Sequence, residues 1–455
     1  MVRIVIACVA LAALSAALLP TVPSYDPWAW IVWGREVVDP HLSFATGGGP
    51  SWKPLPVLFT TVYGLFGGAA PTLWVITARA GGLLALVAAW RLGTRFAGWI
   101  AGLVAVLGLA LTQDWFYYMF RGTSEPMLVA ACLWAIDRHL SGKRPQAFVL
   151  GVAAALIRPE AWPFIGIYAL WLWFREPRLR VLVVAGLASI PVLWFIPPWI
   201  GSGQPFLAAS HAKAYNGHLG NHPALEALRR AGDLQVLPIL IAAAVGVAFA
   251  WFKDRDKAVL SLAAGALAWI VLVVAMVIGG YPGLERFFLP ASAVLCVLAG
   301  IGVARVAMLA GGGAATIAIA AVLIAIAIPF STSRIDTARA QKGLADRAVQ
   351  TLDQLSAAVR AVGGHARVFP CRSSFSAVNH GVQTALAWKL HVTLGRVGTS
   401  LRKPGVLFIG PHNTIDGGRA PVRVNPRVEQ QLARVGGWTV VRVTRPGVSS
   451  RCVGT

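Results

Sequence analysis

The sequence has little charge and very few acidic residues. Of its 455 residues, 13% are charged and 18 are Asp or Glu, while 57% are hydrophobic. A soluble protein of this size carries its apolar residues in stripes, whereas this chain carries them in blocks near 20 residues long, the length of a membrane-spanning helix. The composition therefore excludes an ordinary soluble protein and indicates a polytopic α-helical membrane protein.

The usual motifs of metal, redox and hydrolytic sites are also missing. No CxxC pair, HExxH or Ser-His-Asp order occurs. The glycine runs at 47–49 and 311–313 lack the strand-to-helix context and the Lys of a phosphate loop, so they are interpreted as turns.

Cysteine is scarce, with five residues in all. Three lie in apolar blocks and are interpreted as inert small apolar residues: Cys8, Cys132 and Cys296. The other two, Cys371 and Cys452, lie in the polar C-terminal region. If that region is outside the cytoplasm, a disulfide between them can persist, and we predict one.

Eleven apolar segments are visible, and about eleven transmembrane helices are therefore predicted. The first segment can also be interpreted as a cleaved signal peptide, but the many later segments favour a span. The segments are 3–22, 71–90, 97–113, 124–140, 147–157, 160–174, 180–200, 234–252, 258–278, 287–308 and 314–330.

The net charge of +22 comes from 40 Lys and Arg against 18 Asp and Glu. Such a balance often indicates nucleic-acid binding, but in a membrane protein basic residues hold cytoplasmic loops in place. Counting spans puts the basic loops around Arg91, Arg138, Arg175, Lys253 and Arg305 on the side of the N-terminus. That side is predicted to be the cytoplasm, and the C-terminus is predicted to be outside.

Residues 331–455 are predicted to form a second, small α/β domain outside the cytoplasm. A helical run ends at Gly363–Gly364, strands are expected at "ARVFPC", "GVLFIG" and "WTVVRVTR", and a helix at "AVNHGVQTALAWKLHV". The region holds 18 Lys and Arg against 5 Asp and Glu. This surplus of positive charge has two interpretations. The domain either meets an anionic membrane face or an anionic substrate, or the charge only keeps it soluble.

Residues 24–67, "SYDPWAWIVWGREVVDPHLSFATGGGPSWKPLPVLFTTVYGLFG", follow the first apolar segment and hold four charged residues of interest: Asp26, Glu36, Asp39 and Lys53. Tryptophan favours the headgroup zone of a bilayer, and the segment "DPWAWIVWGREVVD" contains three tryptophans. It is therefore predicted to be an interfacial helix. Because Asp26 precedes Pro27 at the start of this helix, its simplest interpretation is a helix N-cap.

This stretch resembles the first external loop of GT-C glycosyltransferases that use polyprenyl-phosphate sugars, such as the lipid A aminoarabinose transferase and protein O-mannosyltransferase families. Three later segments are similar to GT-C segments in the same order: "RGTSEPMLVAACLWAIDRHL", "GVAAALIRPEAWPF" and "ERFFLPASAVLCVLAGIG". The match covers most of residues 24–308 and leaves the C-terminal domain uncovered. Two departures are Pro27, where many relatives have a second acid, and "KPLP" in place of Lys-Pro-Pro-Leu.

The resemblance implies a membrane glycosyltransferase with a GT-C-like domain at 1–330, a catalytic first external loop at 23–70 and an inverting mechanism. Asp26 is the predicted catalytic base, and Lys53, Arg158 and Arg286 are predicted to bind the donor phosphate. A carboxylate can take the proton of the attacking hydroxyl, and a phosphate leaving group needs cations.

Further polar residues lie in the first external loop, at the outer ends of spans or in the loop 201–233, where each is either structural or part of a sugar or acceptor site. No metal ligand set is assigned, although a divalent metal stays open because the histidine spacing in 211–222 is weak as ligand geometry. These candidates are Glu36, Asp39, Asp114, Arg121, Glu125, Glu160, His211 and His218.

The expected donor is a polyprenyl-phosphate-linked mannose or arabinose, and the acceptor a glycolipid, polysaccharide or protein of a cell envelope, with an actinobacterial origin suggested by the residue usage. The expected partners include membrane lipids and exclude nucleic acid. Two alternatives are a lipid-linked glycan transporter or flippase, and a catalytically inactive GT-C relative that acts in assembly. A transporter predicts charges at mid-span, whereas here they gather at the outer ends.

Overall fold

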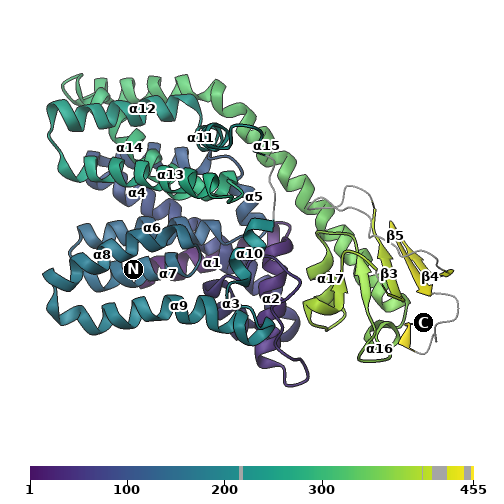
Figure 1. The fold of residues 1–455 in the computed structure, drawn as a ribbon. Helices are drawn as coiled ribbons and strands as arrows, with labels where there is room; N and C mark the ends of the chain where they lie inside the picture. Colours follow the sequence, from purple (N-terminus) through teal and green to yellow (C-terminus); the bar gives the residue numbers. More distant parts are fainter. Residues whose placement is uncertain (215–218, 402, 412–427, 445–451, 455) are drawn as a thin grey trace.

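The computed structural model describes residues 1–214, 219–401, 403–411, 428–444 and 452–454. Figure 1 shows a bundle of long helices with a smaller part, which contains the sheet, at one end of it. The predicted architecture, a polytopic helical membrane protein with a small C-terminal α/β domain, is therefore confirmed.

All eleven predicted apolar segments are helical. The helices of the bundle and of the loops that join them are α1 (Val2–Leu18), α2 (Tyr25–Val38), α3 (Pro54–Gly64), α4 (Ala70–Ala110), α5 (Trp115–Phe120), α6 (Glu125–Leu140), α7 (Arg144–Ala155), α8 (Trp162–Arg175), α9 (Arg180–Ser202), α10 (Leu207–Ala214), α11 (Pro223–Asp233), α12 (Leu237–Ala248), α13 (Lys257–Ile278), α14 (Leu289–Met308) and α15 (Gly313–Ala361). Short 3₁₀ helices include η1 (Gly67–Ala69), η2 (Pro159–Ala161) and η5 (Glu285–Phe288).

Helix α4 contains two of the predicted spans, 71–90 and 97–113, folded back on each other. Ala97 and Gly98 have non-helical angles, and the φ of 78° at Gly98 suits glycine. A Cβ added to Gly93 would lie 2.6 Å from the carbonyl oxygen of Ala101, so the two halves touch through their backbones. The glycines therefore allow a tight helical hairpin. Its two arms correspond to the two spans predicted from the sequence.

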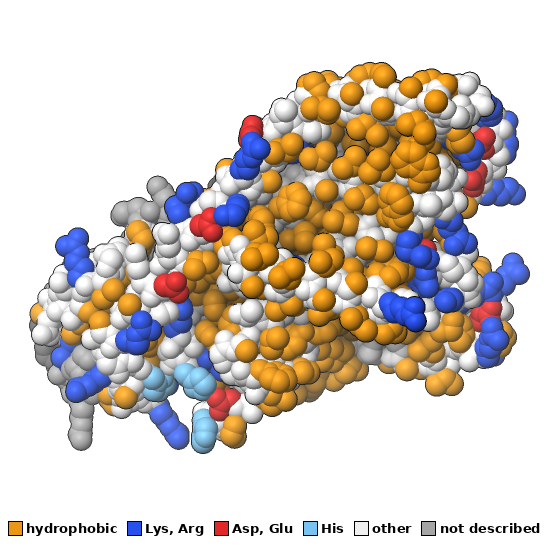
Figure 2. Space-filling model, turned by 180° about the vertical axis from the view of Figure 1, so that it is seen from behind, with side chains coloured by type: hydrophobic (Ala, Val, Ile, Leu, Met, Phe, Trp, Pro, Cys, Tyr) orange, Lys and Arg blue, Asp and Glu red, His pale blue; other side chains and the backbone are white. Residues whose placement is uncertain are grey.

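Five helices of the described chain are long and apolar enough to cross a membrane by length and composition, or six if the bent pair of α11 and α12 forms one span. This count treats α4 as one helix. The predicted total of about eleven also includes helices of fewer than 18 residues, such as α1, α6 and α8. Figure 2 shows hydrophobic side chains over the middle of the bundle, as expected for a lipid-facing surface.

The loops separate into the two predicted groups at opposite ends of the bundle. Arg91 lies 3.4 Å from Asp137, Arg144 pairs with Glu176, and Arg305 lies 3.2 Å from Asp254, so loops of the basic group contact one another in pairs. The C-terminal domain lies at the other end (Figure 1).

Helices α2 and α3 pack tightly against each other at the end of the bundle nearest the C-terminal domain. A Cβ added to Gly34 of α2 would lie 2.3 Å from the backbone carbon of Thr60 in α3, and Thr60 donates a hydrogen bond of 2.6 Å to the carbonyl of Trp30. Ten of the 14 residues of α2 are buried, including Trp28, Trp30 and Trp33. The predicted interfacial helix is therefore covered by protein on most of its surface.

Helix α15 continues without a break from the bundle into the C-terminal domain, so the predicted boundary at 331 lies inside a helix. The domain adds α16 (Gly364–Val368), α17 (Gln383–Lys389) and a five-stranded sheet of order β2-β1-β3-β5-β4. Its strands are β1 (Ser376–Val378), β2 (Val397–Gly398), β3 (Gly405–Ile409), β4 (Val428–Val435) and β5 (Trp438–Thr444). β1 is parallel to β2 and β3, whereas β3 and β5, and β5 and β4, are antiparallel.

Two of the three predicted strands are confirmed, as β3 and β5, and the third is wrong. The first half of "ARVFPC" lies in α16, which begins after Gly363 (φ 84°), and Val368 and Phe369 at the end of this helix are buried in the core. The helix predicted over 377–392 is confirmed only for α17, because its first residues belong to β1. The predicted disulfide between Cys371 and Cys452 is present, with a Cα–Cα distance of 5.2 Å.

Candidate active site

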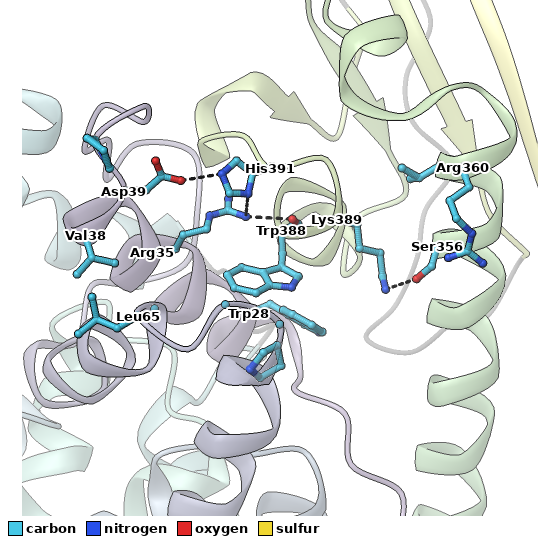
Figure 3. Close-up of a pocket in the computed structure, with 16 residues that line it drawn as sticks. Trp28, Arg35, Val38, Asp39, Leu65, Ser356, Arg360, Trp388, Lys389 and His391 are labelled. Carbon is cyan, nitrogen blue, oxygen red and sulfur yellow. Dashed lines mark hydrogen bonds and ion pairs between the residues drawn. The ribbon is translucent and has the colours of Figure 1, made fainter.

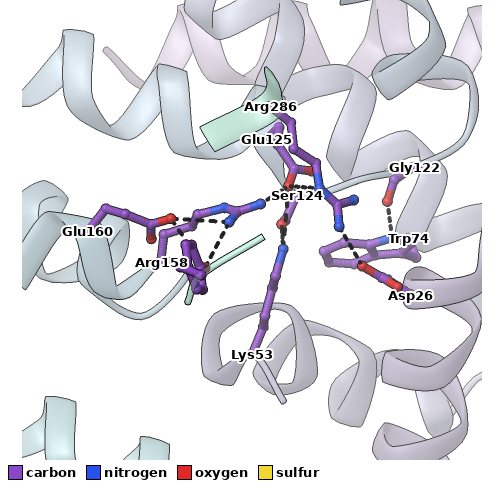
Figure 4. A network of polar contacts seen from close by, with 10 residues as sticks. Asp26, Lys53, Trp74, Gly122, Ser124, Glu125, Arg158, Glu160 and Arg286 are labelled. Atoms are coloured by element: carbon purple, nitrogen blue, oxygen red, sulfur yellow. Dashed lines mark hydrogen bonds and ion pairs between the residues drawn. The ribbon is translucent and has the colours of Figure 1, made fainter. Parts of the chain in front are cut away.

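Six of the residues predicted from the sequence meet in one network of polar contacts (Figure 4). At its centre is the buried carboxylate of Glu125, at the first turn of α6. Its Oε1 lies 2.6 Å from Arg158, 3.5 Å from Lys53 and 3.8 Å from Arg286. One carboxylate thus gathers three cations from three distant parts of the chain.

Lys53 is fixed in the network because it precedes α3 in extended backbone, with Pro54 at the first helical position. Its ammonium donates a hydrogen bond of 2.8 Å to Ser124 and lies 5.1 Å from the ring centroid of Trp30. Burial lowers the pKa of Lys53 to about 8, against the opposing effect of Glu125. The charge of Lys53 is therefore sensitive to pH in the mildly alkaline range.

A second buried carboxylate, Glu160, holds Arg158 from the other side. Arg158 lies between α7 and α8, and its Nη1 is 3.3 Å from Glu160. The hydroxyl of Tyr281 donates to the same Glu160 oxygen at 3.3 Å, and the Arg158 guanidinium lies 4.0 Å from the ring centroid of Phe287. Arg158 is thus held rigidly.

Asp26 joins the network through Arg286, whose Nη2 lies 3.6 Å from Asp26 Oδ2. The two side chains are 24% and 28% exposed, in contrast to 1% for Glu125, so they form the accessible edge of the network. The N-cap of α2 is Ser24 and Asp26 lies within the first turn, so the N-cap interpretation of Asp26 is wrong.

Several buried polar atoms of the network have no hydrogen-bond partner within the described chain. They are Oε2 of Glu125, Oε2 of Glu160, Nε of Arg158 and Nε of Arg286. A buried unsatisfied group costs about 1–3 kcal/mol, and such groups in a functional site are consistent with contacts to a ligand.

Glu36 lies in the last turn of α2 and Asp39 directly follows this helix, at the contact with the C-terminal domain. Glu36 is buried and accepts a hydrogen bond of 2.9 Å from the amide of Ala45, and burial raises its pKa to about 8. Asp39 lies 2.7 Å from Nε2 of His391. Hydrogen bonding, first from the backbone of His41, lowers the pKa of Asp39.

The remaining candidates make other contacts. Asp114 accepts a hydrogen bond from Gln341 of α15, and burial raises its pKa. The Arg121 guanidinium lies 5.9 Å from the ring centroid of Tyr117. His211 contacts the carbonyl of Pro50 at 3.2 Å, and His218 lies outside the described residues.

Sequence reasoning missed the clamp between the C-terminal domain and Tyr25, the neighbour of Asp26. The Tyr25 hydroxyl donates a hydrogen bond of 3.0 Å to Gln383, Thr384 donates one of 3.0 Å to the Tyr25 carbonyl, and the Tyr25 ring stacks on His380. Ser124 and Tyr281 were also missed. A serine beside Glu125 was a weak signal for Ser124, but nothing in the sequence indicates the clamp.

Within the described part of the chain, no group of three or more His, Cys, Asp or Glu side chains could hold a metal ion. The carboxylates of the network are each met by Lys or Arg instead.

Comparison with known proteins finds solved structures of similar fold. ArnT from Cupriavidus metallidurans, a lipid A aminoarabinose transferase, has a TM-score of 0.60 at 15% identity, covering 97% of both chains. The Archaeoglobus fulgidus oligosaccharyltransferase has a TM-score of 0.50 at 13% identity, covering 90% of this chain and 68% of its own. No family model matches the sequence, and no curated protein matches it. At these identities the similarity shows the fold, which is the GT-C fold of both structures, and the match with ArnT extends over the C-terminal domain as well.

Proposed function

We propose that this protein is a membrane glycosyltransferase that moves a sugar from a polyprenyl-phosphate donor to a cell-envelope acceptor on the outer face of the membrane. The observation that carries the proposal is the convergence of Lys53, Arg158 and Arg286 beside the accessible carboxylate of Asp26. The GT-C fold and the order of the four resembling segments support it.

In the proposed reaction, an acceptor hydroxyl attacks the anomeric carbon as the bond from that carbon to the phosphate oxygen breaks. The proton of the hydroxyl passes to Asp26, and the electron pair of the broken bond stays on the phosphate. A single base and attack from the face opposite the phosphate imply inversion. The three cations would stabilise the developing phosphate charge, because charge-assisted hydrogen bonds from Arg and Lys to phosphate are strong.

The geometry of Arg286 suits this role. Its 3.6 Å separation from Asp26 is too long for a hydrogen bond, so Arg286 can still donate to a phosphate and Asp26 can still accept from a hydroxyl. The two buried acids, Glu125 and Glu160, would keep the cations in place before the donor binds. Such preorganisation reduces the reorganisation needed during the reaction.

The test is transfer by the purified full chain in lipid, with polyprenyl-phosphate mannose, arabinose and other sugars offered one at a time to envelope glycolipid, polysaccharide and protein fractions. We expect one donor to be consumed, with matching gain of glycosylated product and polyprenyl phosphate. Transport of intact lipid-linked glycan between leaflets of sealed vesicles, with no product formed, would support the flippase alternative. Donor binding with neither transfer nor transport would support the inactive relative.

A further inference from the structure

A cavity of about 760 Å³ lies between the membrane domain and the C-terminal domain, and none of the six residues of the site network lines it. One wall is the C-terminal half of α2 with the turn at 64–71, and the other is the end of α15 with α17 (Figure 3). The two domains thus share this cavity, and anything bound in it would touch both.

The cavity wall is basic. Arg35, Arg360 and Lys389 line it, while Asp39 is the one carboxylate among the described residues that do so. Asp39 is already held by His391 at 2.7 Å. Carbonyl oxygens of Trp388 and Val392, at 3.0 and 2.9 Å, hold Arg35, with no carboxylate within 4 Å of it in the described chain. The wall therefore carries three cations against one carboxylate, with Glu36 acting on Arg35 and Asp353 on Lys389 from outside the lining.

Two of these cations, Arg360 and Lys389, form no ion pair within the described residues. Lys389 donates to the neutral hydroxyl of Ser356, one turn before Arg360 on α15. Arg360 is exposed and makes no ion pair or hydrogen bond with the described residues. Burial lowers the pKa of Lys389, and the charge of Arg360 lowers it further, against the effect of Asp353. A bound anion would relieve this repulsion.

The rim of the cavity on the membrane side is apolar. Leu65, which lines it, is 71% exposed, and its neighbour Phe66 is 61% exposed. Trp28 and Trp388 form the inner wall, with ring centroids 6.2 Å apart. The headgroup level of a bilayer favours tryptophan, and it also favours basic residues beside exposed apolar ones. The lining of this cavity has both features.

We propose that this cavity binds the headgroup phosphate of an anionic membrane phospholipid, with its acyl chains leaving across Leu65 and Phe66. The phosphate would contact Lys389 and Arg360 and so tie the C-terminal domain to the first external loop. This lipid site is separate from the proposed glycosyl-transfer site, so the proposal does not depend on the proposed reaction.

The experiment measures lipid binding to the purified full chain in detergent by native mass spectrometry, with phosphatidylglycerol against phosphatidylcholine. We expect the anionic lipid to bind more tightly. Removing both cations, in Arg360→Gln/Lys389→Gln, should weaken its binding about 25-fold, roughly fivefold per cation. The matched control is Arg339→Gln/Lys342→Gln on the same helix, whose side chains pair with Asp336 and Asp346 at 3.2 and 3.0 Å, and it should leave binding unchanged.

Arg360→Gln alone should weaken binding about fivefold and keeps the test usable if the Lys389 variant fails to fold. Inorganic phosphate at millimolar concentration should leave the lipid bound. Equal binding of both lipids, unchanged binding in the variants, or displacement by inorganic phosphate would overturn the proposal. So would displacement by polyprenyl phosphate at a much lower concentration than phosphatidylglycerol, because the cavity would then be a donor site.

Discussion

Nη2 of Arg286 lies 3.6 Å from Oδ2 of Asp26, and Nε of the same guanidinium lies 3.8 Å from Glu125. Arg286 therefore connects an accessible carboxylate to a buried one. In the proposed reaction this divides two roles between the acids: Asp26 takes a proton, and Glu125 positions cations. The first prediction below tests the role of Asp26, and the second tests one of the cations beside Glu125.

Asp26→Asn keeps the size of the side chain and removes the proton acceptor. We expect turnover to fall about 100- to 10,000-fold, the usual contribution of one positioned base, while donor binding persists. Turnover is measured with the donor identified in the panel above. Asp336→Asn, an exposed acid of α15 that pairs with Arg339, is the matched control and should retain activity. Near-normal turnover of well-folded Asp26→Asn would remove Asp26 from the mechanism.

Lys53 should give the reaction a pH limit on the alkaline side. Its pKa of about 8 lies below the ordinary value, so it loses its charge, and with it part of the phosphate site, as pH rises through 8. We expect kcat/KM, which reports the free enzyme, to fall above pH 8. Lys53→Arg should remove this fall, and Lys342→Arg should not. A profile that is flat to pH 9.5 in the wild-type protein contradicts the assignment.

Glu36 should make the stability of the protein depend on pH. Its pKa is raised from 4.5 to about 8 in the folded state, so folding favours its protonated form. The stabilisation is fully present below pH 4.5 and is lost as pH rises through 8, by at most roughly 5 kcal/mol.

We therefore expect the Tm in detergent to fall between pH 5 and 8, and to fall less in Glu36→Gln, whose amide oxygen can still accept from Ala45. Asp346→Asn, at an exposed acid of α15, serves as control and should follow the wild type. Parallel curves for wild type and Glu36→Gln would show that Glu36 is ionised in the fold.

The Cys371–Cys452 disulfide closes a loop of 81 residues and should stabilise the C-terminal domain by about 2–4 kcal/mol. Cys371→Ser/Cys452→Ser should lower the Tm and expose the domain to protease, whereas Cys132→Ser should do neither. Thiol labelling of both cysteines in unreduced protein from cells would show that the bond does not form.

Topology is tested with a reporter that is active only outside the cytoplasm. Fused after Thr455 it should be active, and fused after Arg255 it should be silent, because the basic loops are predicted to be cytoplasmic. The opposite result would place the whole site network on the cytoplasmic face and remove access to an external acceptor.

Much of the helical architecture is determined by the sequence alone. Apolar blocks of near-membrane length can satisfy their backbone groups only as helices in lipid, so the eleven segments are predictable from composition. Asp26, Lys53, Glu125, Arg158, Glu160 and Arg286 were also identified as candidates, through the resemblance to GT-C segments and because charges beside apolar blocks are costly. The division of loops between the two ends follows from counting spans.

The tertiary structure alone decided which of these charges meet. Glu125 and Arg158 are 33 positions apart and Arg286 lies far beyond, and only the packing of α6, α7 and α14 brings them to one carboxylate. "ARVFPC" fits both a strand and a helix over so few residues, and packing of Val368 and Phe369 against the core selected the helix. The contacts of α17 with Tyr25 and Arg35 join residues more than 350 positions apart, and no local pattern encodes them. Local periodicity thus determines the elements, whereas the site and the cavity depend on long-range packing between them.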